Sequence, residues 1–222
     1  MSHSVIPSPV QRIAVFGAGH VGPVIARIAL EAGFDVAIAA SGSPESLELI
    51  TQVVMPGVEA RWAADAAAAA DVVVLAIPLH RFPALDPGPL DGKLVVDAMN
   101  YWAAADGVVP MFQGQDLSSS EIVQRRLSRS TVVKSLNQIA YHDLEDGRRP
   151  AGSPDRHAIG VAGDDPNAAK LVGEIIDRFG YDPVLVGSLS AGRVLQPGGP
   201  VFGAVLTRSH FEQAIHSTAV RS

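Results

Sequence analysis

Hydrophobic residues follow two spacings along this chain. Short continuous apolar runs are typical of buried strands, and apolar residues three and four positions apart are typical of helices. Runs of the first kind predict strands at 13–16, 35–39, 59–62, 72–77, 94–96, 131–136, 158–162 and 184–186. The second spacing predicts helices near 21–32, 44–54, 63–70, 118–127, 166–179 and 202–215. Strands that alternate with helices predict an α/β fold with a doubly wound parallel sheet of the Rossmann type.

The same pattern divides the chain into two regions. Residues 1–136 contain a glycine-rich turn between the first strand and the first helix, and they predict a dinucleotide-binding domain. Residues 137–222 add two strands and a segment rich in glycine and proline at 188–200. We expect this second region to be a small C-terminal α/β extension that packs on the first. It would form the side of the binding site that receives the substrate to which the dinucleotide passes its hydride, called the acceptor below.

The glycine-rich turn reads Gly17-Ala18-Gly19-His20-Val21-Gly22. Between a strand and a helix, such a loop is typical of dinucleotide binding. Gly17 permits the tight turn, Gly19 lets the backbone approach a pyrophosphate, and Gly22 lets helix and strand pack closely. Backbone N–H groups at the helix start face the phosphates. His20 is either a phosphate donor or a tolerated variable position.

The end of the second strand bears on the choice of nucleotide. NAD-binding loops carry an acidic residue about 20 positions beyond the glycines, where it binds the ribose hydroxyls. The corresponding window, residues 39–43, contains no carboxylate. Ser41 and Ser43 offer hydroxyls to a 2′-phosphate instead, so NADP(H) is favoured. Ser43 could alternatively serve only as the cap of the helix that follows.

Further candidates lie where other strands end. The carboxyl ends of parallel strands meet at one edge of the sheet, and open α/β sheets bind their ligands there. Ile77, Pro78 and His80 follow one strand, Asn100 follows the next, and we expect these four to border the ribose and nicotinamide. Lys134 offers a cation at the same edge, unless it is a solvated strand end.

The acceptor side of the site is predicted from two segments. Asn137 offers an amide at a strand end, and residues 196–200 read Gln-Pro-Gly-Gly-Pro, which lets a backbone approach a planar ring. This run could instead be a plain linker. We predict that the acceptor contacts Asn137, Gln196, Gly198, Gly199 and Phe202. Hydride transfer between flat rings needs positioning more than side-chain chemistry, so no catalytic residue is predicted.

Composition narrows the function classes. The 222 residues carry a net charge of −6, which argues against a general nucleic-acid binder. Cysteine is absent and the seven histidines lack metal-ligand spacing, so we expect no disulfide and no metal site. The sequence suggests neither a signal peptide nor a membrane span. We therefore expect a cytoplasmic protein with a small-molecule hydride acceptor and no membrane partner, and a homodimer is compatible with the sequence.

The ordered motifs resemble a known family, the NADPH-dependent reductases of the deazaflavin coenzyme F420. The resemblance spans nearly the whole chain. It rests on the glycine loop and on residues 43–47, 71–78, 95–100, 132–137, 161–165 and 195–200. It implies hydride transfer between NADP(H) and coenzyme F420. The family often carries Asn-Ser-Arg where this chain has residues 40–42, so the arginine that would bind the 2′-phosphate is missing.

Two other functions stay open. One is an NADPH-dependent reductase of another acceptor, such as a flavin, an imine or a carbonyl compound. The other is a non-catalytic NADP-binding sensor, which would need no acceptor wall. The chain lacks a tyrosine followed by lysine four positions later and lacks a Gly-x-Ser-x-Gly elbow. Short-chain dehydrogenases and α/β-hydrolases are therefore disfavoured.

Overall fold

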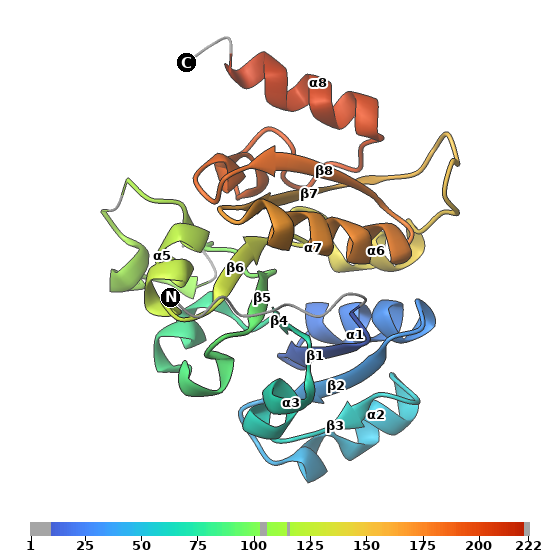
Figure 1. Ribbon diagram of the computed structural model, residues 1–222, viewed down its shortest axis with the longest axis vertical. Coiled ribbons are helices and arrows are strands. Elements are labelled where there is room, and N and C mark those ends of the chain that lie inside the picture. The colour runs from blue at the N-terminus through green and yellow to red at the C-terminus, as the bar shows by residue number, and fades with distance from the viewer. Residues whose placement is uncertain (1–9, 103–105, 115, 220–222) are drawn as a thin grey trace.

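A sheet of eight strands organises the protein (Figure 1). The computed structural model describes residues 10–102, 106–114 and 116–219. The strand order is β3-β2-β1-β4-β5-β6-β7-β8. The strands are β1 (Arg12–Phe16), β2 (Asp35–Ala39), β3 (Glu59–Ala60), β4 (Val72–Leu75), β5 (Leu94–Asp97), β6 (Thr131–Lys134), β7 (Ala158–Gly163) and β8 (Asp182–Gly187). The predicted doubly wound α/β fold is confirmed.

Helices connect the strands. They are α1 (Val21–Glu31), α2 (Glu48–Val53), α3 (Ala63–Ala69), α5 (Ser119–Arg126), α6 (Tyr141–Asp146), α7 (Pro166–Arg178) and α8 (Arg208–Ala219). Short 3-10 helices lie at Pro44–Leu47, Leu79–Ala84, Gly88–Leu90, Pro110–Phe112 and Ala191–Leu195. Two helices have side-chain caps at their starts. Ser118 and Glu121 form a capping box at the start of α5, and Asp165 caps α7 with its side chain.

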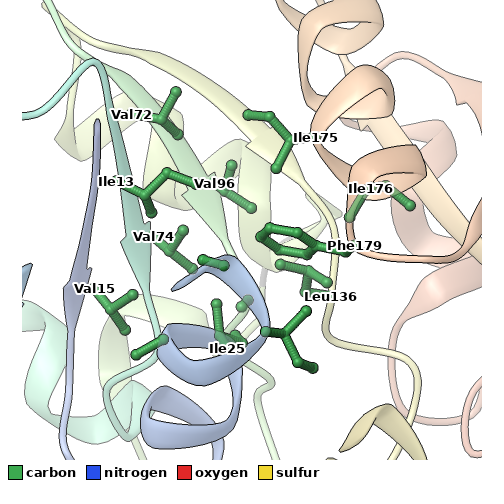
Figure 2. Close-up of a cluster of buried hydrophobic side chains, with 14 of the residues drawn as sticks. Ile13, Val15, Ile25, Val72, Val74, Val96, Leu136, Ile175, Ile176 and Phe179 are labelled. Carbon is green, nitrogen blue, oxygen red and sulfur yellow. The ribbon is translucent and has the colours of Figure 1, made fainter. Parts of the chain in front are cut away.

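The central strands β1, β4 and β5 are buried on both faces because nearly all of their residues are apolar. Ile13 and Val15 of β1 join a core cluster with α1, α6 and α7, whereas Ala14 and Phe16 join a second cluster with α3 and α5. Figure 2 shows the first cluster, in which Ile25 of α1 and side chains of β1, β4 and β5 gather on one side of the sheet. Burial of this apolar area on both faces stabilises the arrangement.

Among the details that differ from the expectations are a strand direction, a helix start and an additional helix. β7 runs antiparallel to β6, because an alternation of strands and helices does not fix the direction of any one strand. The last helix begins at Arg208 and not near residue 202, since Gly203 has a φ of +73°, which a helix cannot continue through. Helix α6 was not expected, because its six residues bury a single apolar side chain, that of Leu144.

The division at residue 136 stays a prediction. One sheet runs through both regions, and the first core cluster contains residues from Val10 to Tyr181. The two regions therefore share a continuous core on the α1 and α7 face of the sheet. A third, smaller cluster joins β7 and β8 to Phe211 of α8, outside that shared core.

Candidate dinucleotide and acceptor site

The three glycines of the loop between β1 and α1 have different surroundings. Gly17 has a φ of +120°, and a Cβ there would lie 2.4 Å from the carbonyl oxygen of Ala76, just beyond β4. A Cβ at Gly22 would lie 1.8 Å from the carbonyl oxygen of Gly17. Nothing lies within 4 Å of a Cβ built on Gly19. Two glycines are thus required by the fold, and the third leaves the free space that a pyrophosphate needs.

The start of α1 borders that space. Gly19 and His20 are exposed, and Ala18 and Val21 are half-buried. The N-cap residue His20 makes no side-chain hydrogen bond to the helix. N–H groups in the first turn of a helix have no intrahelical partner, and an anion at this position can accept from them. The residues of the glycine loop therefore lie together at the start of α1, and their contact with a pyrophosphate stays a prediction.

The end of β2 lies next to the loop, since the Gly17 N–H donates to the carbonyl of Ala39 at 2.8 Å. Ser41 is exposed, and Ser43 precedes the 3-10 helix at Pro44–Leu47. A hydrogen bond from the Ser43 side chain holds the pKa of Glu45 below its usual value. A carboxylate thus lies just outside the acid-free window, and it faces one of the two hydroxyls predicted to bind a 2′-phosphate.

The segment after β4 connects the nucleotide loop to the next strand end. Ile77 is half-buried, and exposed Pro78 precedes the 3-10 helix at Leu79–Ala84. His80 Nδ1 lies 3.2 Å from Asp106, whose carboxylate also accepts the Trp102 N–H at 2.9 Å. His80 is therefore tied to the segment after β5. Asp106 was not predicted, because it follows no strand end or motif.

Asn100 and Asn137 meet at the ends of β5 and β6. The Asn137 amide donates to Asn100 Oδ1 at 2.8 Å and to the carbonyl of Leu195 at 2.7 Å. The Asn100 amide donates to the backbone carbonyl of Asn137 at 2.8 Å. Leu136 has a φ of +63°, an uncommon conformation for this residue type, so the turn at this strand end is strained. The two predicted amides thus form one unit that also holds the segment leading into the acceptor wall.

The predicted acceptor wall, residues 196–202, lies against this unit. Gln196 Nε2 donates to Ser119 Oγ at 3.0 Å, and the Gly203 N–H donates to the carbonyl of Gln138 at 2.7 Å. The ring of Phe202 meets that of Trp102 edge-on, with 5.9 Å between centroids. The wall is therefore fastened at both ends to the edge that carries the nucleotide loop.

The two glycines of the wall, Gly198 and Gly199, have different surroundings. Gly198 has a φ of +88° and open space around its Cβ position. A Cβ on Gly199 would lie 2.3 Å from the carbonyl oxygen of Val194. Gly199 is therefore required for the turn itself, whatever its part in approaching an acceptor.

Lys134 is the last residue of β6, three positions before Asn137, and it is fully buried, not solvated. Its ammonium donates to Asp97 Oδ2 at 3.3 Å and to the carbonyl of Met99. Asp97 also accepts the Ser120 hydroxyl at 2.6 Å. Burial lowers the pKa of Lys134, and the charge of Asp97 opposes that shift. Lys134 supports the strand end that presents Asn100 and offers no cation to a ligand from this position.

Two further findings concern partners. Among the described residues, no three His, Cys, Asp or Glu side chains come together in a way that could hold a metal ion. None of the helices in the described part of the chain combines the length and hydropathy that a membrane span needs.

Several solved structures are similar to this chain over most of its length. The hypothetical protein SMa0349 from Sinorhizobium meliloti is 28% identical with a TM-score of 0.73, covering 89% of this chain and 96% of that chain. A protein from Arthrobacter sp. FB24, named as a candidate F420-dependent NADP reductase, is 27% identical with a TM-score of 0.71, covering 89% and 100%. An imine reductase from Pseudomonas sp. shares the fold at 17% identity and a TM-score of 0.56, covering 95% and 63%.

A curated relative matches a shorter stretch. The protein YjhV of Escherichia coli (strain K12) is 36% identical over 59 residues, which are 27% of this chain and 43% of that protein. The match therefore spans less than half of the relative's length. Residues 12–101 also match the family described as coenzyme F420-dependent NADP oxidoreductases. This match confirms the resemblance drawn from the sequence, and together with the similar solved structures it supports an NAD(P)-dependent oxidoreductase.

Proposed function

We propose that the protein exchanges a hydride between NADP(H) and coenzyme F420 at the carboxyl edge of β1, β4, β5 and β6. The observation that carries the proposal is the hydrogen-bonded unit of Asn100 and Asn137. It joins the segment after β5 to the acceptor wall through the carbonyl of Leu195. The family resemblance supports F420 as the acceptor.

In this proposal, different sets of the predicted residues bind different parts of the dinucleotide. The loop at 17–22 holds the pyrophosphate with backbone N–H groups, and Ser41 and Ser43 hold the 2′-phosphate. The nicotinamide half lies towards β4 and β5, because the adenosine ribose lies at the end of β2 on the other side of the loop. Ile77, Pro78, His80 and Asn100 border that half.

The acceptor side supplies flat surface and amides. When bound, the reduced nicotinamide supplies the hydride. The protein has to hold two flat rings at near-attack distance and to keep water away from them. Trp102 is 54% exposed and touches Phe202, so the two rings offer aromatic surface to a planar acceptor. Gln196 and Gly198 complete this side, and we assign no side chain as a catalytic acid.

The test is an acceptor panel. The purified protein is mixed with NADPH or NADH and with F420, a free flavin, a cyclic imine or a carbonyl compound, and oxidation of the nicotinamide is followed by absorbance. We expect turnover with NADPH and F420, unchanged by a chelator. Turnover of the imine or carbonyl compound without F420 would replace the acceptor, and NADPH binding without turnover of any acceptor would favour a sensor.

Wall variants localise the acceptor. Phe202→Ala should raise the acceptor KM and leave the NADPH dissociation constant unchanged, because Phe202 lies on the wall and not at the nucleotide loop. Gly199→Val is unsuitable for this purpose, since its side chain would strike the carbonyl of Val194 and distort the turn. Leu49→Ala, at an exposed position of α2, is a matched control. Wild-type acceptor kinetics in Phe202→Ala would contradict the proposed wall.

A further inference from the structure

Tyr141 lies beside the glycine loop, although no motif marks it. It is the first residue of α6, and its side chain is large and aromatic yet 42% exposed. Its ring stacks on that of His20, with 5.3 Å between centroids and 18° between ring planes. A tyrosine from the second half of the chain thus borders the space above Gly19.

This position is fixed by the contact between two helices. Arg27 of α1 pairs with Glu145 of α6, and Glu31 of α1 pairs with Arg148 just beyond α6. The paired positions advance together along the chain, so α1 and α6 run in the same direction and begin at the same end. Both helices therefore start at the glycine loop, and the stack joins His20, the N-cap of α1, to Tyr141, the first residue of α6.

The connection to β6 shows which half of a dinucleotide Tyr141 would meet. In the strand order, β6 lies on the opposite side of β1 from β2. The chain leaves β6 at Lys134, passes Asn137, which bonds to Asn100, and reaches Tyr141 four residues after Asn137. The adenosine ribose belongs at the end of β2. Tyr141 consequently borders the loop on the nicotinamide side.

We propose that Tyr141 is a further nucleotide-binding residue, whose ring and hydroxyl contact the nicotinamide-side phosphate and ribose of the dinucleotide. The proposal rests on the nucleotide site of the proposed function. The ring, held by His20, covers one side of the pyrophosphate space, and the phenol hydroxyl donates to a phosphate oxygen. A hydrogen bond to an anion is stronger than one between neutral groups, so the hydroxyl is expected to contribute measurably to affinity.

The test separates the two halves of the ligand. Dissociation constants of NADPH and of adenosine 2′,5′-bisphosphate, which lacks the nicotinamide half, are measured by titration calorimetry for the wild type, Tyr141→Ala and Tyr141→Phe. His142→Ala is the control, since it removes the adjacent exposed ring of α6. Melting temperatures check that each variant is folded.

We expect Tyr141→Ala to weaken NADPH about tenfold and Tyr141→Phe about threefold, with the bisphosphate unchanged in both. His142→Ala should bind both ligands as the wild type does. Unchanged NADPH affinity in Tyr141→Ala, or equal weakening of both ligands, would overturn the proposal. If Tyr141→Ala does not fold, Tyr141→Phe alone is used: unchanged NADPH affinity in this variant, or equal weakening of both ligands, would overturn the proposal. A wild type that binds neither ligand would instead refute the nucleotide site itself.

Discussion

Lys134 shows how a single residue can be misjudged from its position in a motif. At the end of a predicted strand, a lysine is usually solvated, because burial of an ammonium group is costly. Here the strand end is covered, and Asp97, Met99 and Ser120 complete a hydrogen-bonded network around it. The apolar pattern identifies β5 and β6, but it cannot reveal that the polar residues at their ends pair with one another.

Breaking this network should destabilise the protein strongly. Lys134→Ala leaves the buried carboxylate of Asp97 without its cation, which typically costs about 3–5 kcal/mol of unfolding free energy. Lys134→Met combined with Asp97→Asn removes both charges and should recover most of the loss. Urea denaturation of the variants and the wild type measures this. A loss below about 0.5 kcal/mol for Lys134→Ala, the range of ordinary surface substitutions, would show that the pair does not support the strand ends.

Charge near Ser43 should tune the choice of nucleotide. Glu45 faces the Ser43 hydroxyl, and its negative charge opposes a 2′-phosphate there. Glu45→Gln should improve the preference for NADPH over NADH about two- to fivefold at low salt, since the group is exposed and screened. Ala40→Asp should shift preference the other way, towards NADH.

The comparison is made by titrating each variant with both nucleotides. Glu48→Gln, at an exposed position at the start of α2, is the matched control. If Glu45→Gln and Glu48→Gln leave the preference equally unchanged, the 2′-phosphate does not bind beside Ser43.

At the scale of elements, the β1–α1 connection contains two kinds of glycine. A methyl group at Gly22 would meet the carbonyl of Gly17, whereas one at Gly19 would meet open space. Gly22→Ala should therefore lower the melting temperature, because α1 would have to move away from β1. Gly19→Ala should leave the melting temperature unchanged and weaken NADPH binding, because its methyl group occupies the pyrophosphate space.

Thermal melts and NADPH titrations of the same two variants check this. The pair serves as its own control, since both substitutions add one methyl group to the same loop. Full NADPH affinity in a folded Gly19→Ala would mean that the pyrophosphate does not lie over this glycine.

The acceptor wall is a second element whose position depends on distant contacts. The 3-10 helix at Ala191–Leu195 ends where Asn137 holds the carbonyl of Leu195, and Ser119 at the start of α5 holds Gln196. Glycine and proline at 197–200 predict an irregular segment, but they do not say what it touches. From the sequence, the wall could be assigned to the acceptor side only through the rule that open α/β sheets bind their ligands at the carboxyl edge of the strands.

At the scale of the whole molecule, the sequence predicts the layered fold well and the site only in part. Apolar runs and helical spacing identify the sheet because burial on both faces demands them at β1, β4 and β5. The direction of β7 and the presence of helix α6 could not be predicted in this way, because neither depends on a strong apolar period. The role of Tyr141 could not be predicted either, because its contact with His20 joins residues that lie far apart in the sequence.

Direct transfer of hydride between the two bound rings is the central claim, and isotope transfer tests it most directly. NADPH that carries deuterium at the transferable position of the nicotinamide ring is mixed with the protein and F420 under anaerobic conditions in ordinary water, and the reduced acceptor is analysed by mass spectrometry after a single turnover. The account predicts that the deuterium appears in reduced F420. Reduced F420 without deuterium, or no reduction of F420 while NADPH binds, would contradict it.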